Sequence, residues 1–196
     1  MKIERPKSPS PLPSSAVKVF EGEIFSVYQW QQKMYDGSLA TFEKVARPDT
    51  VVVVPVTRDG EVVIIHEEQP NTVPKTKVPT GRIEKGEDVE AAAARELLEE
   101  TGYKAEYYTL WMSMQPLSKV EWAVYVLIGH NVEKVQEAAL EVGEKIIPKL
   151  VSIDNFLELA ASDELELYEI EVDVLRAKLD PDLMDHLKAR FRTESI

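Results

Sequence analysis

One stretch decides the fold of this chain: Gly81-Arg82-Ile83-Glu84-Lys85-Gly86-Glu87, followed after an Ala-rich run by Arg95-Glu96-Leu97-Leu98-Glu99-Glu100-Thr101-Gly102-Tyr103. Residues 87–101 are predicted to form a helix, because they begin with an acidic turn, contain consecutive alanines and stop at Gly102. Each residue of a helix advances about 100°, so Glu96, Glu99 and Glu100 share one face. Leu97 and Leu98, with Ala91 and Ala94, share the opposite face, which suits packing against a sheet.

The three glutamates on one face, here called the acid stripe (Glu96, Glu99 and Glu100), can be interpreted in two ways. A run of like charges is usually a solvated face. These carboxylates repel one another at helical spacing, however, and a hard divalent cation such as Mg²⁺ would turn that repulsion into attraction. Gly81 and Gly86 precede the helix, as expected where backbone approaches a ligand closely. Spacing alone leaves both interpretations open.

Composition restricts the class of protein. The chain has 196 residues, 44% of them hydrophobic, with 23 Lys and Arg against 35 Asp and Glu, for a net charge of −12. This charge argues against nucleic-acid and anionic-membrane partners. The absence of cysteine excludes disulfides, thiolate chemistry and cysteine-based metal sites. The longest apolar run, residues 51–56, is too short to span a bilayer. We therefore expect a soluble, cytoplasmic globular protein.

The chain is predicted to contain three parts. Residues 1–16 alternate Pro and Ser and are expected to form a flexible arm with nothing to bury. Residues 17–47 are expected to form a strand hairpin around Asp36-Gly37. Residues 48–196 are expected to form the main domain, whose fold class is α/β (α+β). Its expected strands are 51–56, 61–67, 105–112, 121–128 and 145–152, and its later helices are 154–161, 164–179 and 181–191.

The central stretch resembles the Nudix signature, Gly-x5-Glu-x7-Arg-Glu-U-x-Glu-Glu-x-Gly-U, where U is an aliphatic residue. The matching positions are Gly81, Glu87, Arg95, Glu96, Leu97, Glu99, Glu100 and Gly102, and Tyr103 replaces the final aliphatic residue. Residues 19–67 resemble the N-terminal strands of ADP-ribose and ADP-sugar pyrophosphatases, and Pro79-Thr80-Gly81 resembles their Pro-Ala-Gly. The resemblance implies a Nudix fold, an α/β/α sandwich with a mixed sheet and an N-terminal antiparallel hairpin.

The resemblance also implies an activity, namely hydrolysis of a nucleoside diphosphate linked to another group, with Mg²⁺ or Mn²⁺ as the cofactor. Carried over by position, Glu96 and Glu100 would be the principal metal ligands. Glu99 would be a supporting ligand or the base, and the carbonyl of Thr80 or Gly81 would complete the coordination. Arg95 would orient the glutamates. By helical angle Glu87 points away from the acid stripe, so it is expected to fix the loop.

In the ADP-ribose branch the catalytic base is implied to come from a loop before the last core strand. Glu144 is the better match here and Glu141 is the reserve, while the alternative is that both are surface acids in an acidic chain. Phe42 and Phe25 lie where the branch has base-stacking aromatics, although a strand aromatic is more often core. The branch pairs through its N-terminal strands, so we expect a homodimer.

Departures from the branch leave the substrate open. The branch usually carries an Arg-Gln-Tyr-Arg-like stretch after Ile65, and this chain has His66-Glu67-Glu68-Gln69. ADP-ribose or another nucleoside diphosphate sugar is the leading expectation. The alternatives are a dinucleoside polyphosphate or a nucleoside triphosphate, or a Nudix-fold module that senses a nucleotide without cleaving it. The intact acid stripe argues against the sensor.

Overall fold

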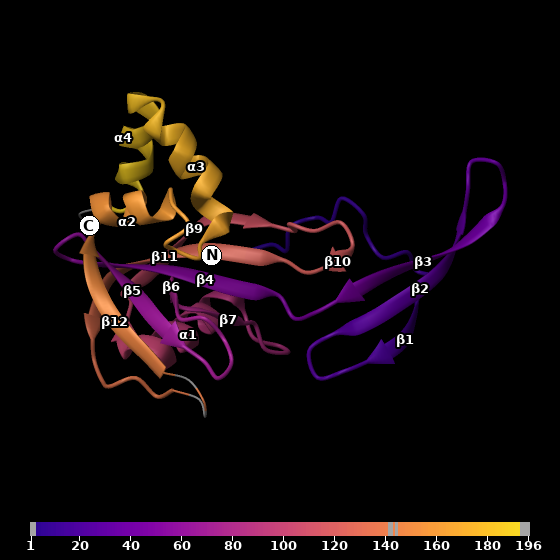
Figure 1. Ribbon diagram of the computed structural model, residues 1–196, viewed down its shortest axis with the longest axis horizontal. Helices are drawn as coiled ribbons and strands as arrows, with labels where there is room; N and C mark the ends of the chain where they lie inside the picture. Colours follow the sequence, from indigo (N-terminus) through magenta and orange to yellow (C-terminus); the bar gives the residue numbers. More distant parts are fainter. Residues whose placement is uncertain (1–2, 141–142, 144, 193–196) are drawn as a thin grey trace.

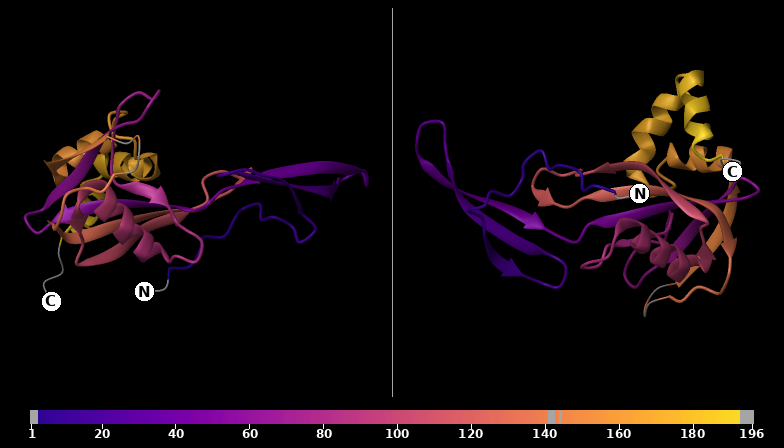
Figure 2. Two further views of the ribbon diagram at one scale, coloured as in Figure 1. Left: turned by 90° about the horizontal axis from the view of Figure 1, so that it is seen from below. Right: turned by 180° about the vertical axis from the view of Figure 1, so that it is seen from behind.

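The computed structural model describes residues 3–140, 143 and 145–192, and it divides the chain into two sheets (Figure 1). The smaller sheet has the order β1-β2-β3-β10, formed by β1 (Val17–Glu21), β2 (Ser26–Lys33), β3 (Leu39–Ala46) and β10 (Val120–Glu121). β1, β2 and β3 are antiparallel, and β10 pairs in parallel with β3. This sheet extends well away from the rest of the molecule (Figure 2).

The predicted hairpin turn at Asp36-Gly37 is present. Gly37 has a φ of +89°, and the Asp36 carboxylate accepts bonds from the backbone N–H and the hydroxyl of Ser38. The single strand expected before it, residues 20–34, is instead broken into β1 and β2. Gly22 lies at the break, where its N–H bonds to the carbonyl of Phe25 at 2.8 Å.

The larger sheet carries the main core. Its order is β12-β5-β4-β11-β8, and three further strands attach to it, with β6 on β5, β7 on β4 and β9 on β11. The members are β4 (Thr50–Thr57), β5 (Glu61–Glu68), β6 (Lys75–Lys77), β7 (Thr80–Arg82), β8 (Tyr103–Lys104), β9 (Tyr107–Met114), β11 (Val124–Lys134) and β12 (Lys145–Ser152). β4 and β11 are parallel and the other pairs are antiparallel, which confirms a mixed sheet.

Helices cover both faces of this sheet (Figure 1). Val51 and Val53 of β4 face α1 (Val89–Thr101) in one core cluster, and Val52 and Val54 face the other cluster. That second cluster contains α2 (Ile153–Ala160), α3 (Tyr168–Lys178) and α4 (Pro181–Ala189). Consecutive valines are buried because a strand covered on both faces has no polar side. The predicted α/β/α layering is therefore confirmed.

The helix that carries the acid stripe has the expected signals at both ends. The side chain of Asp88 caps its first turn by accepting from the N–H of Ala91 at 2.9 Å. Gly102 ends it in the left-handed conformation, with φ of +75°. A Cβ at this position would overlap the carbonyl of Gln136, so the position also requires the small residue. The helix begins at Val89, two residues later than predicted, because Glu87 and Asp88 belong to the loop that caps it.

The N-terminal arm has neither helix nor strand from residue 3 to 16, but it is held against the protein. Ile3 packs on the cluster under α1, which corrects the expectation that this segment has nothing to bury. Arg5 forms ion pairs with Asp49 and Glu121 at 2.8 and 2.7 Å. The buried Lys44 ammonium donates to the carbonyl of Ser10 at 2.7 Å. These are specific polar partners that a composition argument does not reveal.

Candidate active site

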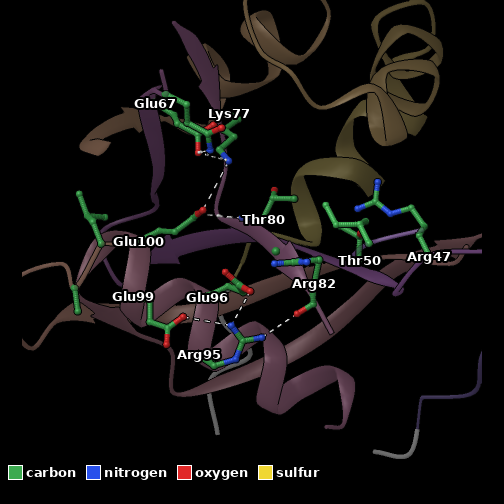
Figure 3. Close-up of a pocket in the computed structure, with 15 residues that line it drawn as sticks. Arg47, Thr50, Glu67, Lys77, Thr80, Arg82, Arg95, Glu96, Glu99 and Glu100 are labelled. Carbon is green, nitrogen blue, oxygen red and sulfur yellow. Dashed lines mark hydrogen bonds and ion pairs between the residues drawn. The ribbon is translucent and has the colours of Figure 1, made fainter. Parts of the chain in front are cut away.

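A cavity of about 550 Å³ lies where β7 and the C-terminal half of α1 meet β5, β6 and the junction of β3 with β4 (Figure 3). The wall on the helix side contains Arg95 and all three glutamates of the acid stripe. The opposite wall is basic, because Arg47, Lys77 and Arg82 contribute to it. The structure therefore brings the acid stripe together with a set of cations in one cavity.

Gly81 allows the strand to approach the helix closely. It lies in β7, opposite Val51 of β4, and a Cβ added to it would overlap the carboxylate of Glu96. Any side chain at this position would displace that carboxylate from where it lies, so the glycine predicted for backbone approach has a defined steric reason. Burial raises the pKa of Glu96 above its ordinary value, and the neighbouring Arg95 opposes that rise.

Arg95 is the centre of the ion-pair network on the helix. Its guanidinium donates to Glu87 at 2.9 and 3.0 Å, to Glu96 at 2.7 Å, and to Glu99 at 3.3 Å. It also donates to the carbonyl of Arg82. The Arg95 guanidinium holds the pKa of the Glu87 carboxyl below its ordinary value. Glu87 in turn accepts from the N–H of Glu84 in the loop before the helix, so it holds the loop as expected, although the helical angle used for that expectation does not apply to a residue before α1.

Glu100 is the most deeply buried member of the acid stripe, with 6% of its surface exposed. Its carboxylate accepts from the N–H of Thr80 at 3.1 Å and lies 3.7 Å from the ammonium of Lys77. Lys77 is closer to Glu67, at 2.9 Å, so it is shared between two acids. Burial raises the pKa of Glu100 to about 8, and Lys77 only partly offsets the cost of desolvating it. Glu100 is thus a buried acid with too little positive charge around it.

Arg47, on the basic wall, is a partly buried cation that has no anionic partner among the described residues. Its guanidinium lies 4.8 Å from the ring centre of Trp122 and 5.9 Å from that of Phe25. Its Nε is buried without a hydrogen-bond partner in the described part of the chain. Burial, with a smaller contribution from Arg82, lowers the pKa of Arg47 from its ordinary value. A phosphate in the cavity would give this guanidinium the anionic partner that no described residue provides.

The donor set fits a divalent cation. Glu96 and Glu100 are carboxylates at one wall of a polar cavity, Glu100 is short of positive charge, and hard cations prefer oxygen ligands. Among residues 3–140, 143 and 145–192, no three acidic or histidine side chains are already gathered around one point. The chain's own cations hold these carboxylates instead, Glu96 through Arg95 and Glu100 through Lys77.

The two predicted base-stacking residues, Phe42 and Phe25, do not line the main cavity. Phe42 lines a separate cavity beside Lys119, whose ammonium lies 5.0 Å from its ring centre, and it is not among the residues of the main cavity. Phe25 is 45% exposed and does not line the main cavity itself, although its ring lies 5.9 Å from the Arg47 guanidinium and its neighbour Ile24 lines the cavity. Glu141 and Glu144 lie outside the described residues. The segment just before them, Ala139 and Leu140, does line the main cavity, and the N–H of Ala139 bonds to the carbonyl of Glu99 at 2.8 Å.

Comparison with known proteins agrees with this geometry. The model of the NUDIX domain matches residues 46–169, a span that contains the larger sheet, the acid stripe and the start of α3. The chain belongs to the Nudix family. This confirms the predicted Nudix hydrolase and its fold class. Hydrolases of this family generally use a divalent metal, which agrees with the donor set.

Three relatives of this Nudix chain are informative. It is 27% identical over 151 residues to the ADP-ribose pyrophosphatase of Bacillus subtilis (strain 168), covering 76% of this chain and 82% of that protein. It is 31% identical over 90 residues to the methanol dehydrogenase activator of Bacillus methanolicus, covering 45% of this chain and 49% of that protein. The crystal structure of an ADP compounds hydrolase matches with a TM-score of 0.66 at 18% identity, over 90% of this chain and 98% of that chain. At that identity the last match bears on the fold alone.

Sequence reasoning missed the basic wall of the cavity. Arg47 and Lys77 lie outside the signature, and each reaches the site only because β4 pairs with β7 and β5 pairs with β6. Little in the sequence indicated that these two residues belong to the site. A lysine two residues before Pro79 and an arginine at the end of a strand are ordinary surface positions until the sheet topology is known.

Proposed function

We propose that this Nudix chain hydrolyses the diphosphate of ADP-ribose or a closely related nucleoside diphosphate sugar, giving a nucleoside monophosphate and a sugar phosphate. The observation that carries the proposal is the cavity itself, in which Glu96 and Glu100 face Arg47, Lys77 and Arg82. Carboxylates that hold a cation and basic groups that hold phosphate oxygens are the two halves of a diphosphate site. A relative named ADP-ribose pyrophosphatase, matched over most of both chains, supports the choice of substrate.

The cofactor in this proposal is Mg²⁺, or Mn²⁺ in its place. Glu96 and Glu100 would hold the ion, with Glu99 supporting and the carbonyl of Thr80 or Gly81 completing the ligands. When bound, the ion neutralises charge that develops on the diphosphate and lowers the pKa of water. Arg95 contacts one oxygen of the Glu96 carboxylate, so the other oxygen would be available to the ion while the pair is kept. Lys77 lies 3.7 Å from Glu100 and 2.9 Å from Glu67, so it would retain Glu67 as a partner if the ion took its place beside Glu100.

Arg95 then acts as a positioning residue. It contacts Glu87, Glu96 and Glu99 together, so it fixes the helix face against the preceding loop. For the group that removes the proton from water we propose Glu144, with Glu141 as the reserve. Glu99 is the alternative on the helix, because its side chain lines the cavity, is 47% exposed and contacts Arg95 at 3.3 Å.

The quaternary structure in this proposal is a homodimer formed through the smaller sheet, with Phe25 and Phe42 stacking on the nucleobase. The exposed apolar side chains of that sheet support it. Val17, Phe20 and Leu39 are 63%, 58% and 66% exposed, an unusual amount of apolar surface for one hairpin sheet. Within the described part of the chain, no helix is long and apolar enough to span a membrane. A cytoplasmic location and the lack of a nucleic-acid partner stay predictions from the composition.

A substrate panel tests the proposal. Wild-type protein is incubated with Mg²⁺ and with ADP-ribose, other nucleoside diphosphate sugars, a dinucleoside tetraphosphate and nucleoside triphosphates. Products are separated by chromatography, and a phosphatase releases phosphate from the monoester products. We expect ADP-ribose or a near relative to give the highest kcat/KM, with AMP as one product. Preference for the tetraphosphate or a triphosphate would refute the substrate class, and binding without turnover of any compound would identify a sensor.

A further inference from the structure

A second cavity, of about 300 Å³, opens beside the first one. Arg47, Thr50, Glu67, Lys77 and Thr80 line both cavities, so the two are adjoining chambers with a common wall. In Figure 3, Arg47 and Thr50 of this common wall lie on the side of the cavity away from Glu99. A substrate with its diphosphate in the first chamber would extend one of its two ends past Arg47 into the second.

The far wall of the second chamber comes from Trp122 and from the beginning of α3. The indole N–H of Trp122 donates to the hydroxyl of Thr50 at 2.9 Å, which fixes the ring, and Arg47 covers one of its faces. The beginning of α3 contributes Tyr168, which is 65% exposed, and Glu169, which is half-buried. The second chamber thus adds aromatic and carboxylate groups to the shared Arg47 and Lys77, whereas the acid stripe lines only the first.

The Glu169 carboxylate has no partner on another residue within 3–140, 143 and 145–192, whereas its neighbour Glu166 is paired with Lys75 at 2.6 Å. It accepts a hydrogen bond only from its own backbone N–H. Burial raises the pKa of Glu169 above its ordinary value, and that backbone bond opposes the rise only in part. A ligand that donates hydrogen bonds would supply what this carboxylate lacks.

We propose that the second chamber binds the sugar ring of the group linked to the nucleoside diphosphate, with hydroxyls of the ring donating to Glu169. The inference rests on the proposed hydrolysis and specifies which end of the substrate lies there. A pentose presents several hydroxyl donors, and carboxylates accept such bonds strongly. An adenine satisfies this carboxylate less fully, because its 6-amino group is its one donor group and its ring nitrogens are acceptors, whereas the proposed stacking of the base on Phe25 and Phe42 assigns the nucleoside end to the smaller sheet.

The test measures the binding of the two products separately. Ribose 5-phosphate and AMP are titrated calorimetrically into the Mg²⁺-loaded wild type, into Glu169→Gln, and into Glu171→Gln. The last is the matched control, because it makes the same charge change in the first turn of α3 and does not line either chamber. We expect Glu169→Gln to weaken ribose 5-phosphate about tenfold, which corresponds to about 1.4 kcal/mol. AMP binding should change less than twofold, and the control should match wild type.

Two results would overturn the inference: unchanged affinity of Glu169→Gln for ribose 5-phosphate, or an equal or larger loss for AMP. Tyr168→Ala provides a second variant, because its exposed side chain can be removed without disturbing the core. It should weaken ribose 5-phosphate severalfold and spare AMP, and equal losses for both products would count against the sugar assignment. Failure of the proposed function is recognised separately, because wild type would then hydrolyse no ADP-linked compound whatever the variants bind.

Discussion

Replacing Glu100 with Gln should stabilise the metal-free protein above neutral pH. Glu100 is 6% exposed and its pKa is raised from 4.5 to about 8, mainly because burial penalises its charged form. The folded chain therefore keeps a proton that the unfolded chain releases. The contribution of this group to stability is complete below about pH 4.5 and is lost as the pH rises through 8. Gln is neutral at every pH and can still accept from the N–H of Thr80.

The magnitude follows from the two pKa values. The interval from 4.5 to about 8 corresponds to about 5 kcal/mol at about 1.4 kcal/mol per pH unit, which is a ceiling. Near pH 6 the wild type should be less stable than Glu100→Gln by about 2 kcal/mol, and the difference should approach the ceiling above pH 8. Below pH 4.5 the two proteins should be nearly equal.

The assay is urea denaturation in EDTA at several pH values between 5 and 9, with Glu99→Gln as the matched control. The Glu99 side chain is 47% exposed, so its replacement makes the same chemical change without removing a buried carboxylate. Adding Mg²⁺ should stabilise wild type and have little effect on Glu100→Gln. If Glu100→Gln were no more stable than wild type at pH 8, Glu100 would not be the strained acid that the structure indicates.

Three further outcomes are expected. Glu144→Gln should lower kcat by about 10²–10⁴-fold with little change in KM, as for loss of a general base; the same pattern in Glu99→Gln, with Glu144→Gln silent, would assign the base to the helix. Gly81→Ala should reduce kcat/KM more than tenfold and weaken Mn²⁺ binding, because the added Cβ overlaps the Glu96 carboxylate. Trp30→Glu should disrupt the dimer in light scattering, and a wild-type mass near 22.2 kDa would show that there is no dimer to disrupt.

Local signals allowed the helix of the acid stripe to be predicted. Its cap, its glycine stop and the shared face of Glu96, Glu99 and Glu100 depend on neighbours in sequence, so they can be read without a structure. The four consecutive valines of β4 likewise indicated a strand covered on both faces. The break at Gly22 was missed because aromatic and β-branched residues continue through it, and the turn depends on a backbone bond to Phe25.

Contacts between distant segments could not be predicted in the same way. Lys77 reaches Glu100 through the pairing of β5 with β6, and Arg47 meets Trp122 across the junction of the two sheets. Neither pair has a sequence period that reveals it. The N-terminal arm is a similar case, since Arg5 pairs with Asp49 and Glu121, which lie 44 and 116 residues away in the sequence. Such residues are of types common on protein surfaces. Only the strand topology brings them into the site or lets them hold the N-terminal arm.

The central claim is that Glu96 and Glu100 hold the cation on which hydrolysis depends. Its most direct test is the turnover of Glu96→Gln and Glu100→Gln at saturating Mg²⁺, with the nucleoside diphosphate sugar that wild type hydrolyses fastest. Gln has nearly the same shape but no charge, so both variants should fold and lose several orders of magnitude in kcat. If both retained more than about a tenth of the wild-type rate, a loss under about 1.4 kcal/mol, the acid stripe would not be the metal site.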